Sequence, residues 1–249
     1  MTSTVLGPML VAVCVAMAVA AAVVYRLARL GPVWVAPAAA ARAAAQLAAV
    51  SAVLALAISR LWSSLVVLAV MFVVAAATAA RRSHASRGSA CLALPLALGL
   101  IVTVPLLILT GLVPMDGVAL VPVVGILLGG TMTAVAVSAR HALNTLQLRA
   151  GEVEAALSLG LTDRDARHEI IHRAAAEALL PNVDQARTAG LVTLPGAFVG
   201  VLLSTGSAAQ AGAVQVLVLV ALLLAQSCAV ALTSELVARG VITRSGHYT

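Results

Sequence analysis

The chain has 249 residues, of which 62% are hydrophobic and only 10% are charged, and its mean hydropathy is +1.10. A soluble domain is about 45–50% apolar and about 25% charged, and a disordered chain is poorer still in apolar residues. The composition excludes both classes. It predicts an all-α, polytopic integral membrane protein, a helix bundle embedded in the lipid bilayer.

The sequence contains no lysine, and its 15 permanently charged basic residues are all arginines. A phosphate-binding P-loop requires a lysine that reaches the β- and γ-phosphates. The chain is therefore predicted not to be an enzyme and to bind no cofactor; if ATP and Mg²⁺ drive it, they are bound by a partner subunit. With 2% aromatic residues it also lacks the stacking surface of a nucleic-acid-binding protein, so no nucleic acid is expected.

The chain divides into apolar runs that suit a hydrocarbon core about 30 Å thick. Seven runs cover residues 5–24, 33–58, 61–80, 90–113, 118–139, 190–203 and 213–238. The sixth run is short and contains Pro195-Gly196, so it either spans as a broken helix or re-enters from one side. The sequence predicts about seven transmembrane helices in a single domain over residues 1–249.

The arginines indicate the orientation of these spans. They concentrate in alternate connections, whereas the connections on the other side contain only Arg60. The positive-inside rule then places the N-terminus outside and the C-terminus in the cytoplasm of a multi-pass cell-membrane protein. Residues 140–187 form the one long polar stretch, which we expect to be a cytoplasmic helical segment.

This polar stretch contains a helix, a glycine bend and a second helix. The first helix has a smooth face of small and apolar side chains, acidic residues in its first turn, and Gly160 at the position of a C-terminal cap. Thr162 begins the second helix, whose apolar stripe is predicted at Ala166, Ile170, Ala174 and Ala178. Such a shape suits docking in a partner's groove, and an amphipathic hairpin on the membrane surface explains the spacing equally well. The docking residues would be Glu152, Glu154, Ala155, Ala156, Leu159 and Gly160.

Polar, glycine and proline residues within the spans are candidates for a translocation pathway. Two G-x-x-x-G pairs permit close helix approach, and Pro195 interrupts a helix. Packing between helices is the simpler explanation for each glycine alone, and Arg42 equally suits a side chain that reaches the interface. The candidates are Arg42, Gln46, Gly125, Gly129, Thr131, Thr133, Leu194, Pro195, Gly196, Gly200 and Gln215. No set of metal ligands stands out.

Two resemblances give these features a function. Glu154-Ala155-Ala156 followed by Gly160 resembles the EAA-x-x-x-G motif of ABC transporter permeases, where it forms the coupling helix that docks on the ATPase subunit. From about residue 42 to residue 215 the chain also resembles the FetB/YbbM family of metal-export permeases. Residues 125–133 (GILLGGTMT) are similar to that family's GMIIGNAMT, and residues 190–196 (GLVTLPG) to its GLVSLPG.

The resemblance implies the permease subunit of an ABC transporter, a homodimer that exports metal ions, iron among them, and is powered by a separate ATPase subunit. Three departures weaken the metal assignment: Gly130 replaces the family's asparagine, Val214 replaces the tyrosine before Gln215, and residues 197–201 (AFVGV) replace the family's Met-Met-Thr-Gly-Gln. A secondary transporter or channel without an ATPase is one alternative, but the only acidic residue in a span is Glu235. A non-transporting membrane scaffold is another, although it would need no broken helix.

Overall fold

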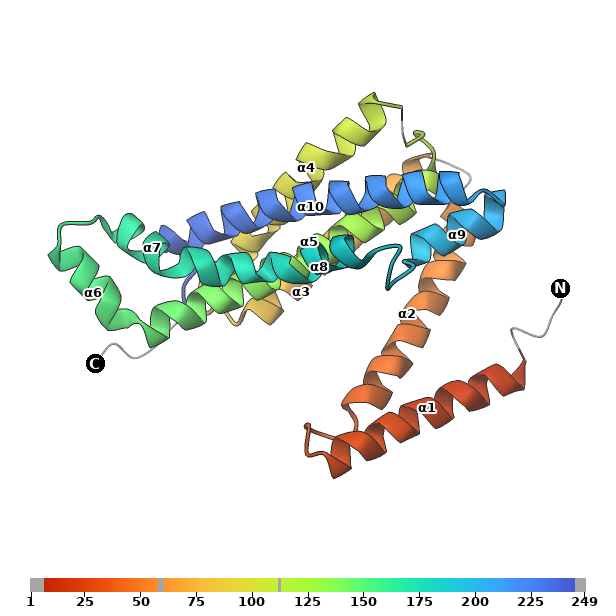
Figure 1. Ribbon diagram of the computed structural model, residues 1–249, viewed down its shortest axis with the longest axis horizontal. Coiled ribbons are helices and arrows are strands. Elements are labelled where there is room, and N and C mark those ends of the chain that lie inside the picture. Colours follow the sequence, from red (N-terminus) through yellow and green to blue (C-terminus); the bar gives the residue numbers. More distant parts are fainter. Residues whose placement is uncertain (1–6, 58–60, 112, 245–249) are drawn as a thin grey trace. The chain divides into compact units, whose positions relative to one another are not determined.

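The computed structural model describes residues 7–57, 61–111 and 113–244, and these residues form helices joined by short turns (Figure 1). The predicted fold class, an all-α polytopic membrane bundle, is confirmed. The chain separates into two compact units, residues 1–59 and 60–249, which are described individually below.

The N-terminal unit consists of α1 (Pro8–Leu27) and α2 (Val35–Ala57), which contact each other. Pro8 occupies the first turn of α1, where backbone N–H groups have no acceptor within the helix, so proline costs no hydrogen bond there. No residue of α1 is buried, and apolar side chains such as Met9 and Leu27 are exposed. A surface of this kind suits lipid. The predicted end of the second span, Ile58, lies outside the described residues.

The core of the C-terminal unit is built around α5, which packs against α3, α4, α7 and α10. Asp116 begins α5, because its carboxylate accepts the N–H of Ala119 at 2.8 Å. Leu96, Leu127 and Val135 are fully buried between these helices. The bundle helices are α3 (Leu61–Ser83), η1 (Ser89–Leu92), α4 (Ala93–Leu109), α5 (Gly117–Leu148) and α10 (Ala208–Ala238).

Two of these helices are longer than a bilayer requires. At about 1.5 Å per residue, the 32 residues of α5 and the 31 of α10 extend about 45–50 Å, against a hydrocarbon core of about 30 Å. α5 therefore continues past the predicted end of its apolar run at residue 139. Beyond α5, the chain forms α6 (Ala150–Ser158) at one tip and returns along α5 and α10 (Figure 1) as α7 (Asp163–Ala176), η2 (Glu177–Leu179) and α8 (Leu180–Thr188).

The predicted sixth span is a much shorter helix than the others. α9 (Gly196–Thr205) has 10 residues, about 15 Å, so it does not cross a bilayer alone. It turns back at Gly206, whose φ is +69°, and packs against α10. In the described part of the chain, five helical segments are long and apolar enough to span: α1, α3, η1 with α4, α5 and α10.

Candidate functional site

The turn between α6 and α7 is a Schellman motif. Gly160 has φ +91°, its N–H donates to the carbonyl of Leu157 at 2.9 Å, and the N–H of Leu161 donates to the carbonyl of Ala156 at 3.2 Å. These two bonds satisfy carbonyls that a helix end otherwise leaves unpaired, and the positive φ favours glycine. The bend that the sequence predicts at Gly160 is therefore present.

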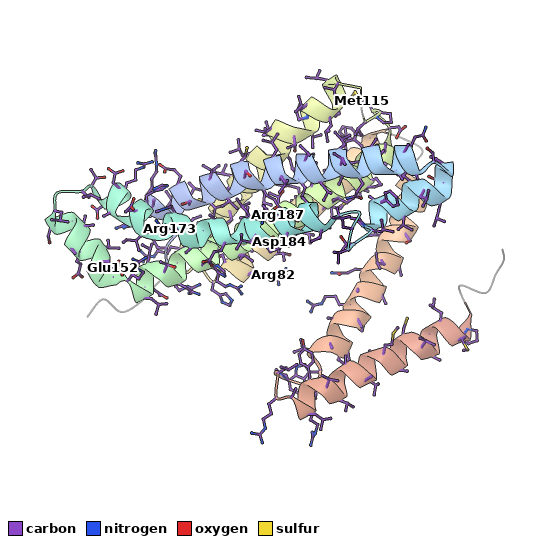
Figure 2. All side chains as sticks on the ribbon, viewed as in Figure 1. Arg82, Met115, Glu152, Arg173, Asp184 and Arg187 are labelled. Atoms are coloured by element: carbon purple, nitrogen blue, oxygen red, sulfur yellow. The ribbon has the colours of Figure 1, made fainter. Side chains whose placement is uncertain are left out.

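The α6 tip is an exposed surface at one end of the bundle; Figure 2 labels Glu152 on it, with Met115 at the other end. No residue of α6 is buried, and Leu159 is 83% exposed. The Nε of Arg149 donates to Glu152 at 2.6 Å, and this bond lowers the pKa of the Glu152 carboxyl. Glu154 and Ala155 are exposed, and Ala156 is half-buried.

α7 is fixed at its start to the end of α10. The side chain of Thr162 accepts the N–H of Asp165, as predicted for the cap. Arg164 then donates through Nε and one terminal nitrogen to the two carboxylate oxygens of Glu235, both at 2.8 Å. Arg239 donates to the same carboxylate at 2.6 Å. The start of α7, which directly follows the turn after α6, is thus held on α10 by charge-assisted bonds.

The buried stripe of α7 differs from the prediction. The structure buries Ala166, Ile171 and Ala175 on α7, followed by Ala178 in η2. Ile170 and Ala174 are half-buried instead. A run of alanines carries little signal about which helix face is inward, because α5 and α10, rather than the local pattern, fix the rotation of α7.

The residues after α10 bind the end of α3. Arg244 donates to the carbonyl of His84 at 2.8 Å, to the carbonyl of Ser83 at 3.0 Å, and to the side-chain oxygen of Asn144. Thr243 exchanges backbone bonds with Arg87 in an isolated antiparallel bridge. We call this set of contacts the C-terminal clamp.

α8 and α9 both pack against α10, and the helix is interrupted between them at residues 189–195. Gly190 adopts φ +83° there, and Pro195 begins α9. Gln215 on α10 accepts the N–H of Phe198 at 3.1 Å, and so satisfies one of the free amides at the start of α9. Gln215 is buried, so the structure gives it a capping role. Leu194 is 60% exposed beside the break.

A buried polar cluster lies further along α10. Asn182 on α8 donates to the side-chain oxygen of Gln226, which is fully buried. The amide nitrogen of Gln226 and the hydroxyl of Thr131 on α5 are both buried without a hydrogen-bond partner. A Cβ added to Gly130 would lie 2.9 Å from that nitrogen. Buried polar groups without partners are uncommon, and they mark this layer of the bundle as unusual.

The predicted G-x-x-x-G contacts are only partly present. A Cβ at Gly125 would lie 3.2 Å from the terminal methyl group of Met71, so a side chain of α3 packs against this glycine. At Gly129, Gly196 and Gly200 a Cβ would meet no described atom of the same chain within 4 Å. At Gly99 the neighbouring atom is helix backbone: a Cβ there would lie 2.7 Å from the carbonyl oxygen of Ala225.

The remaining pathway candidates belong to different helices. Arg42 and Gln46 are exposed residues of α2, in the N-terminal unit. Thr133 is exposed on α5. Gly200 lines a cavity of about 410 Å³ between α4, α5, α9 and α10, whose other lining residues are apolar or small. Among the described residues, no group of three or more His, Cys, Asp or Glu side chains is placed to hold a metal ion.

Gly99, Asn182 and Gln226 were not singled out from the sequence. Gln226 interrupts the apolar run at residues 213–238, and this interruption was the available signal. Asn182 lies in the polar stretch that was expected to be entirely cytoplasmic. Its contact with α10 depends on the return path of α7 and α8, which no local pattern reveals.

A family model described as "Uncharacterised protein family (UPF0014)" matches residues 8–242. The chain is 33% identical over 217 residues to "UPF0014 membrane protein STAR2" of rice, Oryza sativa subsp. japonica, covering 86% of this chain and 75% of that protein. It is 32% identical over 160 residues to "Protein ALUMINUM SENSITIVE 3" of Arabidopsis thaliana, covering 63% of this chain and 59% of that protein.

A bacterial relative bears on the resemblance noted in the sequence. The chain is 32% identical over 101 residues to "Probable iron export permease protein FetB" of Escherichia coli, which covers 41% of this chain and 39% of that protein. The FetB resemblance is therefore confirmed for part of the chain, within a broader family. No solved structure matches the chain. Because the family model matches nearly the whole chain, this protein belongs to the UPF0014 family of membrane proteins.

Proposed function

We propose that this chain is the membrane-spanning permease subunit of an ABC transporter, and that a separate ATPase subunit docks on the α6 tip. The observation that carries the proposal is the exposed α6 helix, which the turn at Gly160 joins to α7, itself fixed to α10 through Arg164 and Glu235. A rigidly held helix can transmit a partner's movement to the bundle, whereas a loosely attached hairpin cannot.

The finer parts of this proposal have separate supports. The name of the Escherichia coli relative, an iron export permease, supports metal ions as the exported substrate. The arginines in alternate connections support a cell-membrane protein with its C-terminus and α6 tip in the cytoplasm. The exposed small residues Gly129 and Gly200 support a homodimer, since such surfaces allow helices of two copies to approach. ATP and Mg²⁺ are bound by the ATPase subunit.

The proposal is tested by isolating the chain with its partner. Tagged protein purified from native membranes in mild detergent is expected to retain an ATPase subunit, identified by peptide sequencing through its Walker motif. Ala156→Arg is expected to abolish this retention, because a long charged side chain is placed on the half-buried face of α6. Ala176→Arg, which adds the same charge to an exposed position of α7, is the matched control and is expected to retain the ATPase.

The alternatives predict different results. If α6 is only a membrane-surface hairpin, Ala156→Arg behaves like Ala176→Arg. If the chain is a secondary transporter or channel, wild type retains no ATPase at all. Cells that carry the wild-type complex are further expected to lose loaded iron faster than cells that carry Ala156→Arg. Equal iron loss in both would contradict metal export by this complex.

A further inference from the structure

One charged surface does not fit its surroundings. Asp184 and Arg187 on α8 form an ion pair at 3.4 Å, yet their side chains are 64% and 72% exposed. Gln185 between them is also exposed. Figure 2 shows Asp184 and Arg187 between the end of the bundle labelled by Glu152 and the end labelled by Met115. We call Asp184, Gln185 and Arg187 the α8 polar face.

Two hydrogen bonds fix the position of this face along α10. Before it, Asn182 bonds the side chain of Gln226; after it, the N–H of Phe198 bonds the side chain of Gln215. The α8 polar face therefore lies beside the part of α10 between residues 215 and 226. Residues 216–225 are all apolar, VLVLVALLLA.

This part of α10 belongs in the hydrocarbon core. The charged residues Glu235 and Arg239 mark one interface, where they meet Arg164 of α7. A core of about 30 Å takes about 20 helical residues, and counting that distance back from Glu235 reaches Gln215. The stretch from Gln215 to Gln226 therefore lies within the core, and the α8 polar face lies at the same depth.

Exposed charges at this depth do not contact lipid. Ionisable groups within a membrane face a protein interior or a water-filled space, because transfer into hydrocarbon removes their hydration. α8 also contacts α10, to which Asn182 is bonded, and Val183 and Ala186 are half-buried like Asn182. We propose that the α8 polar face lines a water-filled path that reaches the middle of the bilayer and admits hydrated ions.

The path alters the predicted membrane depth of α8. The sequence placed residues up to 187 in the cytoplasm, whereas the path places the last of them at membrane depth. The wall of the path carries one carboxylate and one guanidinium, so Asp184 is the group that attracts a cation there and Arg187 is its partner when no cation is present. The identification of the transported ion as a cation depends on the proposed metal export, whereas the water-filled path does not.

Cysteine reactivity tests the path directly. Cys14, Cys91 and Cys228 are first replaced by serine. Gln185→Cys then probes the α8 polar face without removing the ion pair. Val220→Cys is the matched control, because Val220 is 59% exposed and lies on α10 at the same depth. Ser158→Cys, exposed on α6, is the fully aqueous reference. The purified chain in liposomes, opened so that both sides meet the reagent, is treated with a membrane-impermeant cationic methanethiosulfonate.

The expected result is that Gln185→Cys reacts roughly tenfold or more faster than Val220→Cys, because only a hydrated thiol ionises and meets the reagent. Adding Asp184→Asn should slow the cationic reagent and speed an anionic one at Cys in position 185, since both residues face the same water. Equal, slow reaction at positions 185 and 220 would overturn the proposal. So would reaction at position 220 as fast as at position 158, because the pair would then lie outside the membrane.

Spin labels supply a second measurement that does not depend on reactivity. A nitroxide at position 185 should be relaxed more by a water-soluble nickel chelate than by oxygen, and a nitroxide at position 220 should show the reverse. The same preference for oxygen at both positions would refute the path. These experiments use the chain without an ATPase, so a failure to retain an ATPase counts against the proposed function alone.

Discussion

Replacing Gly99 by alanine tests how closely α4 and α10 approach each other. The added Cβ would lie 2.7 Å from the carbonyl oxygen of Ala225 and 3.2 Å from the methyl group of Thr131. The oxygen belongs to a helix backbone and cannot rotate away, so the two helices must separate by several tenths of an ångström. Overpacking of this kind costs about 1–3 kcal/mol. Gly99→Ala is therefore expected to lower the free energy of unfolding by about that amount.

The assay is reversible unfolding in mixed micelles of increasing sodium dodecyl sulfate fraction, followed by circular dichroism. Gly129→Ala is the matched control, because it adds the same Cβ to a neighbouring bundle helix where no described atom lies within 4 Å. Gly129→Ala should leave the free energy of unfolding unchanged or raise it by up to about 1 kcal/mol, the difference in helix propensity between glycine and alanine. If Gly99→Ala and Gly129→Ala unfold at the same detergent fraction, the close approach of α4 and α10 is refuted.

Three further predictions follow from the site. Gly160→Val should prevent retention of the ATPase because its φ is +91°, whereas Gly160→Asn should keep most of it, since asparagine tolerates that conformation; equal recovery of the complex would contradict the turn. Gln215→Leu should cost about 1–3 kcal/mol in the same unfolding assay by leaving the N–H of Phe198 without its acceptor, with Gln210→Leu, at an exposed position, as the unaffected control. With the native cysteines replaced, Met115→Cys should react with an impermeant thiol reagent in intact cells and Ser158→Cys should not; the opposite pattern would reverse the orientation.

Features that depend on neighbouring residues in the sequence were predicted well. The bend at Gly160 and the cap at Thr162 involve residues within one turn, so spacing and side-chain chemistry were enough to place them. The long apolar helices were also predicted, because hydrocarbon requires about 20 apolar residues whatever they pack against.

Features that depend on distant contacts were not. A G-x-x-x-G pair places two glycines on one face, but the rotation of the helix decides whether another helix meets that face; it does at Gly125 and not at Gly129. Gly99 contacts Ala225 without any motif. Likewise, the end of α5 at Leu148 was missed because an apolar run ends at the interface, whereas the helix continues into water for as long as its backbone bonds and its packing against α7 hold.

The C-terminal clamp constrains the order in which the chain is assembled during synthesis. The carbonyls of Ser83 and His84 at the end of α3 receive their donors from Arg244, and Ser83 and Arg244 are separated by 161 positions. A nascent chain that has inserted α3 must therefore leave this end incompletely hydrogen-bonded while α4 to α10 are made. The clamp therefore forms only after α10 has been made, and it joins the first helix of the C-terminal unit to the segment that follows α10.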